Sequence, residues 1–462
     1  MIKVFLNLFI GYICLCPNPT QAQTKTDFPL KLSANKRYLT DNKRKPFLIK
    51  EISAWGLIQA LSEKEESEFM DSVKRKGFNT MLVSIISSDK RFAGGPPDWQ
   101  GISPFKVQWD FSTPNPAYFE HVDRVLRMAS AKGMLVLLVP CYLGYKTDST
   151  QGWWSKVLSP NNSPEKSRLY GEFIGKRYRN QNNIIWVAGG DHKGDGKLHP
   201  HLDNMIRGIK KSDHTHLWTG HFDSTGGGNW SADNELYNKY MDIDGLYVFD
   251  EKNMGPHGPQ YKSELRRYDK GKMIFQLDQS YEKDIPHGPD NEDYQYIRRK
   301  NYGGLLSGCV GTSFSPGYKD HQLYVFKNWR PLMNTEGMKQ MEICFKLFTS
   351  RSWHLLVPDT SAHVIVSDRG LFGDIGYICA AAASDQSTYM AYMPNGGPVK
   401  LDLTALGMKN IKAWWYNPRT GSGAPVGRFS SREQVKAFTS PTNEDWVLVI
   451  DNEKFHHAAP GI

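Results

Sequence analysis

The sequence has few cysteines, and their spacing fits neither a metal site nor a dense disulfide framework. It contains six among 462 residues, and the four beyond residue 22 are far apart. Secreted disulfide scaffolds and zinc modules hold their cysteines at short, regular spacings. We therefore exclude both classes and expect mostly buried thiols at Cys141, Cys309, Cys344 and Cys379.

Charge of one sign is also in only slight excess. The chain has 57 Lys and Arg against 48 Asp and Glu, a net charge of +9. The basic groups at 43–45, 266–267 and 298–300 are scattered, which favours solvated helix faces, with attraction to an acidic polysaccharide as the alternative. The 39% hydrophobic and 12% aromatic content excludes disorder, collagen and fibre.

The most apolar stretch of the N-terminal region is too short to cross a membrane. Lys3 precedes an apolar run over 4–15, and residues 20–22 offer a small-residue cleavage site. A spanning helix needs about 20 apolar residues. We interpret residues 1–22 as a signal peptide and expect no membrane span in the mature chain. This predicts an exported protein, periplasmic or extracellular, for which nucleic acid is not an expected partner.

From about residue 46 to 350, short β-branched and aromatic runs alternate with amphipathic stretches of helical period. This alternation is typical of βα units around a parallel sheet. Eight such units predict an α/β fold, a closed (β/α)₈ TIM barrel over residues 23–351. The expected strands are Phe47–Ile52, Thr80–Ile86, Leu135–Pro140, Ile184–Ala188, His216–Gly220, Gly245–Phe249, Met273–Leu277 and Val310–Phe314. The expected helices are Glu63–Lys76, Pro116–Lys132, Pro164–Arg179, His201–Lys211, Tyr261–Tyr268, Glu292–Leu306 and Gly337–Thr349.

The pattern changes after about residue 352, where helical periodicity stops. Short strand-like runs follow, separated by turn signals such as those at 394–397 and 417–421. They predict a C-terminal all-β sandwich over residues 352–462. The expected strands are His363–Val366, Tyr377–Ala381, Thr388–Tyr392, Val399–Asp402, Ile411–Tyr416 and Trp446–Ile450.

Two aspartates follow expected barrel strands, at the end where such barrels hold their reacting groups. Gly189 and Gly190 let the backbone bend after the fourth strand and aim Asp191 into the barrel mouth, while Asp278 ends the seventh. Opposed carboxylates on these strands are the arrangement of many retaining glycosidases. This pattern predicts a glycoside hydrolase with Asp191 as general acid/base and Asp278 as nucleophile or base. The structural alternative for each is a turn or capping residue.

Aromatic and histidine side chains near the expected mouth favour sugar binding. The histidines at 192, 221 and 257 lack ligand-like spacing, so we expect no metal and no cofactor. Aromatic rings stack on the apolar faces of sugars, with packing beneath loops as the alternative for each ring. The rings concerned are Trp55, Tyr142, Trp153, Trp154, Trp230, Tyr247 and Tyr281.

Successive motifs across the chain resemble those of the bacterial apiosidase-like glycoside hydrolases. The tail, at 352–359 and 415–421, resembles the β-domain that follows the barrel in that family and is labelled as collagen-binding. The resemblance implies a barrel with a C-terminal β-sandwich and exported enzymes that release side chains such as apiose from pectin. The motifs are 53–57 (Ser-Ala-Trp-Gly-Leu), 76–79 (Lys-Gly-Phe-Asn), 118–123 (Tyr-Phe-Glu-His-Val-Asp), 186–191 (Trp-Val-Ala-Gly-Gly-Asp) and 281–282 (Tyr-Glu).

By this resemblance, Asp191 takes the acid/base position, and the chain departs from the family at two others. Asp278 stands where the family has a glutamate nucleophile, and Ile52 replaces an aspartate, with Glu51 one residue earlier. The shorter side chain could also widen the distance between the two carboxyl groups towards that of an inverting enzyme, in which water attacks the sugar. The alternative function is a non-catalytic glycan-binding protein. Glu282 is the fallback nucleophile. The expected substrate-binding residues are Glu51, Trp55, Tyr142, His192, His221, Tyr247, Tyr281 and Glu282.

Overall fold

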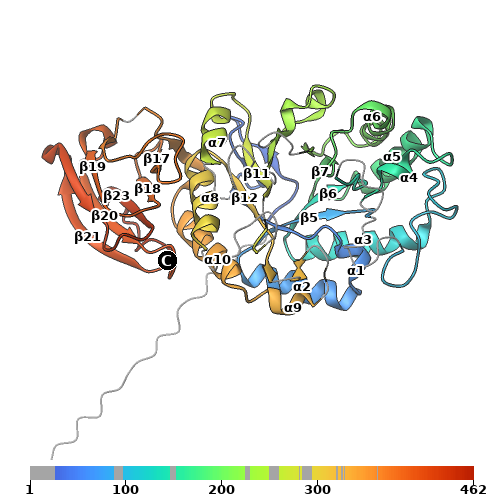
Figure 1. Cartoon of the computed structure of the whole chain (residues 1–462), viewed down its shortest axis with the longest axis horizontal. Coiled ribbons are helices and arrows are strands. Elements are labelled where there is room, and N and C mark those ends of the chain that lie inside the picture. Colours follow the sequence, from blue (N-terminus) through green and yellow to red (C-terminus); the bar gives the residue numbers. More distant parts are fainter. Residues whose placement is uncertain are drawn as a thin grey trace, which may run out of the picture.

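The computed structural model describes most of the chain in two adjoining parts, a barrel and a C-terminal β-domain (Figure 1). The predicted signal peptide lies outside the described residues, as does His257. Those residues are 26–87, 97–145, 152–223, 229–248, 260–279, 281–283, 294–318, 321–323, 326, 328–361 and 363–462.

Eight parallel strands of the described chain form the predicted barrel. Six follow the order β12-β4-β5-β6-β7-β8, and β10 pairs in parallel with β11. Two backbone hydrogen bonds join this pair to the edges of the six-stranded sheet. Beside β8 and β10, the N–H of Ile243 donates to Trp218 O (3.1 Å). Beside β11 and β12, the N–H of Val310 donates to Ile274 O (2.9 Å). The strands are β4 (Ile49–Ser53), β5 (Thr80–Ser84), β6 (Leu135–Val139), β7 (Ile184–Gly189), β8 (Trp218–His221), β10 (Asp244–Val248), β11 (Ile274–Gln279) and β12 (Gly311–Phe314).

Helices surround the barrel, and their sequence signals explain where they begin. Ser62 and Glu65 form a capping box at the start of α2, while Asn115 caps α3 ahead of Pro116. No helix within the described ranges is long and apolar enough to cross a membrane. The helices are α1 (Leu57–Ala60), α2 (Glu63–Arg75), α3 (Pro116–Ala131), α4 (Trp154–Val157), α5 (Pro164–Tyr178), α6 (His199–Lys210), α7 (Tyr261–Tyr268), α8 (Gln295–Leu306), α9 (Trp329–Leu332) and α10 (Glu336–Thr349).

Among the strand boundaries that differ from those predicted, two have a clear physical reason. The expected first strand is divided, because β3 (Pro46–Phe47) pairs with β2 (Leu39–Thr40) in a small meander that begins at β1 (Lys31–Leu32), whereas β4 enters the barrel. The expected fifth strand starts later than His216, since that residue is held in a turn. Its ring Nδ1 lies 2.6 Å from an oxygen of Asp213, whose carboxylate also accepts its backbone N–H (3.2 Å).

Short strands flank the barrel ends. β9 (Asn229–Trp230) pairs antiparallel with β10, and β13 (Gly317–Tyr318) pairs with β14 (His321–Gln322) after β12. Inside the barrel, side chains such as those of Leu82, Leu137 and Val187 pack together in one buried cluster. The C-terminal strand ends therefore rest on a filled core.

The β-domain is the predicted all-β sandwich. A six-stranded antiparallel sheet, order β15-β17-β18-β23-β20-β21, faces a three-stranded sheet, order β16-β19-β22. β15, β21 and β22 were not predicted, because their sequences lack clear apolar alternation. The strands are β15 (Leu356–Pro358), β16 (Ile365–Ser367), β17 (Cys379–Ala383), β18 (Thr388–Met393), β19 (Pro398–Asp402), β20 (Asn410–Tyr416), β21 (Gly423–Ser430), β22 (Val435–Thr439) and β23 (Trp446–Asn452).

The other face of the six-stranded sheet packs on the barrel. Figure 1 shows α8 and α10 at this junction, and their apolar residues share one buried cluster with β17, β18, β20 and β23. Tyr302 of α8 stacks on Tyr392 of β18 with ring centres 5.2 Å apart. The four cysteines in the described ranges are buried and form no disulfide, as expected. The two domains therefore share a core.

Candidate active site

Asp191 is placed by a tight turn at the C-terminal end of β7. Gly189 and Gly190 have φ of +93° and +102°, and Asp191 itself has φ of +60°. A Cβ at Gly190 would lie 2.8 Å from the Tyr142 ring, and one at Gly189 would lie 2.5 Å from His221 O. The two glycines are thus required because the segments after β6 and β8 approach the turn closely.

Asp278 faces the barrel interior because β11 contains an irregularity. Leu277 packs in the inner core, whereas Gln276 points outward to Glu264 of α7 (2.7 Å). Simple alternation would turn Asp278 outward as well. On β10, Leu246 instead pairs with Gln276 and the next residue, Tyr247, pairs with Asp278. Leu277 of β11 therefore has no partner on β10. This bulge returns Asp278 to the inner face.

His221 lies between the two aspartates. Its Nε2 is 3.1 Å from Asp278 Oδ2, and its Nδ1 is 3.3 Å from Asp191 Oδ1. The backbone N–H of Asp191 donates to Nδ1 (3.2 Å), so in the neutral ring Nε2 carries the proton and donates it to Asp278. The two contacts and the width of the imidazole ring together limit the distance between Asp191 Oδ1 and Asp278 Oδ2 to at most about 9 Å. This distance is within the span of glycosidase carboxyl pairs.

Hydrogen bonds hold both carboxylates. Asp191 Oδ2 accepts from the Tyr142 hydroxyl (2.5 Å). Asp278 Oδ1 accepts from Ser53 Oγ (3.2 Å) and from the N–H of Gln279 (3.0 Å), and its Oδ2 also accepts from Tyr281 (3.2 Å). With His221, four donors hold the Asp278 carboxylate in place.

The electrostatics separate the two aspartates. Burial raises the pKa of Asp191, and the charge of Asp278 raises it further, against the opposing effects of His221, Tyr142 and Tyr247. Burial also raises the pKa of Tyr247 and Tyr281 well above the usual value, so both phenols stay protonated and can donate. Burial and the nearby Asp278 thus favour a proton on Asp191.

Four predicted aromatic residues gather at this site. Trp55 lies edge-on to His221 (4.9 Å between ring centres) and 5.1 Å from Tyr142, while Tyr247 stacks on His221 at 3.8 Å. These three rings and Tyr281, which donates to Asp278, are all buried. They therefore pack on His221 and the aspartates.

The other three predicted aromatics lie in different packing environments. Trp153 packs against Phe105 and Phe111 in the core outside the barrel strands. Trp230 donates through Nε1 to Ser263 of α7 (3.0 Å). For both, the alternative of packing beneath a loop describes the structure. Trp154 is half-buried against the same outer core as Trp153.

The remaining predicted residues lie around this centre in different settings. Glu51 is fully buried on the inner face of β4, where burial and then Asp278 raise its pKa well above the usual value. Glu282 is also buried, and its carboxylate accepts from the N–H groups of Gly317 (3.4 Å) and Gly337 (2.9 Å). These contacts tie Glu282 to the start of α10. His192 is half-buried, and its Nδ1 accepts from Gly194 N–H (3.0 Å).

Sequence reasoning missed two donors to Asp278, the Ser53 hydroxyl and the Gln279 backbone. Ser53 stands two residues after Glu51, so strand alternation places both on one face, a signal that could have identified it.

Within the described part of the chain, no group of three or more His, Cys, Asp or Glu side chains is arranged to hold a metal ion. The arrangement can transfer a proton from one carboxyl group, while hydrogen-bond donors orient the second.

Comparison with known families agrees with this architecture. The family model described as "Apiosidase-like, catalytic domain" matches residues 33–354. The chain belongs to this apiosidase-like family. A second model, "Putative collagen-binding domain of a collagenase", matches residues 357–451, the β-domain. None of the curated proteins matches the sequence.

Solved structures similar to this apiosidase-like chain share its fold. A glycoside hydrolase family 5 protein from Bacteroides vulgatus has 22% identity and a TM-score of 0.75, covering 94% of this chain and 97% of its own. Another structure, described as a glycoside hydrolase, has 22% identity and a TM-score of 0.74, covering 93% of this chain and 99% of its own. The barrel with its C-terminal β-domain is therefore a shared two-domain architecture.

Proposed function

We propose that this apiosidase-like protein is an exported glycoside hydrolase that cleaves a complex, pectin-like or other acidic polysaccharide. The observation that carries the proposal is the pair of aspartates on β7 and β11 that contact opposite nitrogens of one imidazole. The family match supports glycosidic chemistry. The slight excess of positive charge would attract an acidic glycan, and the N-terminal residues 1–22 favour export.

Asp191 acts as the general acid. Tyr142 donates to Oδ2 and orients the carboxyl group, whose proton passes to the leaving glycosidic oxygen. Burial and the nearby Asp278 favour this protonated form near neutral pH. After departure of the leaving group, Asp191 is charged and accepts a proton from the attacking water.

Asp278 acts as the nucleophile of a retaining reaction. One oxygen attacks the anomeric carbon as the bond to the leaving oxygen breaks, giving a glycosyl ester that water hydrolyses with Asp191 as base. Ser53, Tyr281 and His221 orient the carboxylate by donating to it. If Asp278 instead activates water directly, the same residues perform an inverting reaction. The anomeric configuration of the first product distinguishes the retaining reaction from the inverting one.

The experiment uses a panel of pectic, algal and host glycans with analysis of the released sugars. Asp191→Asn and Asp278→Asn should each reduce the rate by about 100-fold or more, since each removes a group that takes part in the reaction. Asp195→Asn is the matched control, because Asp195 is exposed on the same loop and should leave the rate unchanged. Nuclear magnetic resonance of the first product should show retained anomeric configuration.

Thermal unfolding of the variants checks that folding is intact. Full activity of Asp278→Asn would contradict its role and move the nucleophile to Glu282 or Glu51. Binding of a glycan by the unmodified protein, with no sugar released from any member of the panel, would instead favour a non-catalytic glycan-binding protein.

A further inference from the structure

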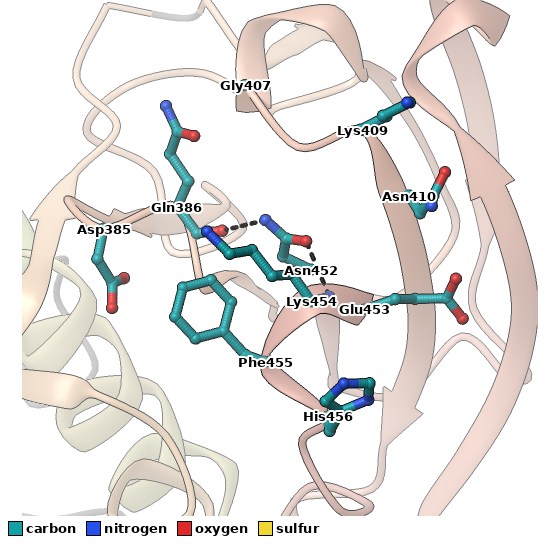
Figure 2. A pocket seen from close by; sticks show the side chains of 10 residues that line it. All are labelled: Asp385, Gln386, Gly407, Lys409, Asn410, Asn452, Glu453, Lys454, Phe455 and His456. Carbon is teal, nitrogen blue, oxygen red and sulfur yellow. Dashed lines mark hydrogen bonds between the residues drawn. The ribbon is translucent and has the colours of Figure 1, made fainter.

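The β-domain contains a hollow of about 530 Å³, separate from the aspartate site (Figure 2). Such a volume is within the range of about 300–1,000 Å³ found for ligand pockets. Three segments of the sandwich supply its walls: the turn between β17 and β18, the loop before β20, and the chain after β23. The lining residues are Asp385, Gln386, Gly407, Lys409, Asn410, Asn452, Glu453, Lys454, Phe455 and His456.

Fixed contacts join these segments. The Asn452 side chain donates to Gln386 O (3.0 Å) and accepts from Lys454 N–H (3.2 Å), as the dashed lines in Figure 2 show. Gly407 has φ of +65°, and a Cβ there would lie 2.7 Å from the Gln386 amide nitrogen. Gln386 and His456 also have positive φ, of +61° and +51°. Uncommon backbone conformations of this kind are found at ligand sites when the surrounding structure holds them.

The hollow presents an aromatic ring beside unused hydrogen-bonding groups. Phe455 is 38% exposed, and Figure 2 shows its ring between Asp385 and Lys454. The side-chain amides of Gln386 and Asn410 form no hydrogen bond with the residues that the structure describes. A ring with nearby amides can bind a sugar through its apolar face and its hydroxyl groups.

The positive charges at the hollow slightly exceed the negative ones. Lys409 and Lys454 are exposed, and neither forms an ion pair within the described ranges. The acidic groups are already engaged: Glu453 pairs with Arg428, and Asp385 Oδ1 accepts the N–H of Ser387 (3.0 Å). Counting Arg428, the groups at the hollow carry one excess positive charge. Lys454 Nζ lies 5.9 Å from the centre of the Phe455 ring, so a carboxylate on a ligand can meet this ammonium group beside the ring.

We propose that this hollow is a second glycan site that binds a uronate-containing oligosaccharide segment. One sugar ring stacks on Phe455, its carboxylate lies between Lys409 and Lys454, and its hydroxyls bond the amides of Gln386 and Asn410. The proposal rests on the proposed function in one respect, the acidic class of the polysaccharide. The site would hold the polymer on the β-domain while the barrel acts on another part of it, which raises the local substrate concentration.

Binding is measured on the full chain carrying Asp191→Asn, so that turnover does not interfere. The probes are polygalacturonate, its methyl-esterified form, and dextran, compared by affinity electrophoresis and calorimetry. Polygalacturonate should bind, the methyl ester should bind more weakly, and dextran should not bind. Added salt should weaken polygalacturonate binding, because it screens exposed charges.

Two variants and two matched controls locate the site. Phe455→Ala and the double variant Lys409→Ala/Lys454→Ala should each weaken polygalacturonate binding at least about tenfold, which corresponds to about 1.4 kcal/mol. Phe372→Ala and Lys400→Ala should leave binding unchanged, because Phe372 is an exposed phenylalanine (46%) and Lys400 an exposed lysine elsewhere in the β-domain. Thermal unfolding confirms that each variant is folded.

Three outcomes would overturn the proposal: no binding of polygalacturonate, binding that survives both site variants, or binding of soluble collagen in place of the glycan. These results are independent of catalysis because the protein carries Asp191→Asn. Failure of the proposed function would show as absent sugar release by the unmodified protein, whatever the binding result.

Discussion

Asp445→Ala tests whether the barrel and the β-domain form one stable unit. Asp445 is only 1% exposed and accepts from Arg298 Nε (2.6 Å) and Nη2 (2.9 Å) across the domain junction. It also accepts from Arg419 Nη1 (2.8 Å) and the Tyr392 hydroxyl (2.9 Å). Removing it leaves the buried Arg298 charge without its carboxylate. Breaking a buried pair in this way costs about 3–5 kcal/mol, a large fraction of a total stability of about 5–15 kcal/mol.

The assay is urea unfolding followed by tryptophan fluorescence and by circular dichroism. Glu444→Ala is the matched control, since Glu444 precedes Asp445, pairs with the same Arg419 at 3.3 Å and is 61% exposed. Its loss should cost less than about 1 kcal/mol, as for other surface pairs. If Asp445→Ala costs no more than this control, the junction does not depend on the buried pair and the reasoning is wrong.

Two further predictions concern pH and export. Burial lowers the pKa of His121, but Glu66 and Asp98 outweigh it and hold that pKa above the usual value of about 6.5. The folded state therefore keeps a proton that the unfolded chain releases, so this stabilisation is complete below about pH 6.5 and lost as the pH rises through the raised pKa. Thermal unfolding across this range should show the loss, and His121→Gln should reduce the slope; an unchanged slope would refute the assignment. For export, mass spectrometry of the protein from its native host should find a chain beginning near Gln23, and intact Met1 would contradict it.

The barrel could be predicted because its signals are local. Alternating apolar strands and capped amphipathic helices recur along the chain, as at Ser62 and Asn115, and each predicts an element without knowledge of its neighbours. Strands β21 and β22 could not be found this way, since most of their residues are at least partly exposed. Their pairing depends on β20 and β19, which supply partners far away in the sequence.

The site was predictable in position and less so in detail. Asp191 and Asp278 follow from the rule that reacting groups lie at the C-terminal ends of barrel strands. The role of His221 as a bridge could not be predicted, because it depends on the backbone N–H of Asp191, which a strained turn aims at the ring. Spacing along the sequence carries no information on such contacts between strands.

The shorter side chain of Asp278 fits the backbone around it. The bulge at Leu277 brings the Asp278 Cα to the inner face, where donors on β4, β8 and the segment after β11 surround its carboxylate. A glutamate at the same Cα would extend its carboxylate one methylene further, past the position where these three donors meet the carboxylate of Asp278. The position of this carboxylate is therefore set by the register of β10 and β11 as much as by the residue type.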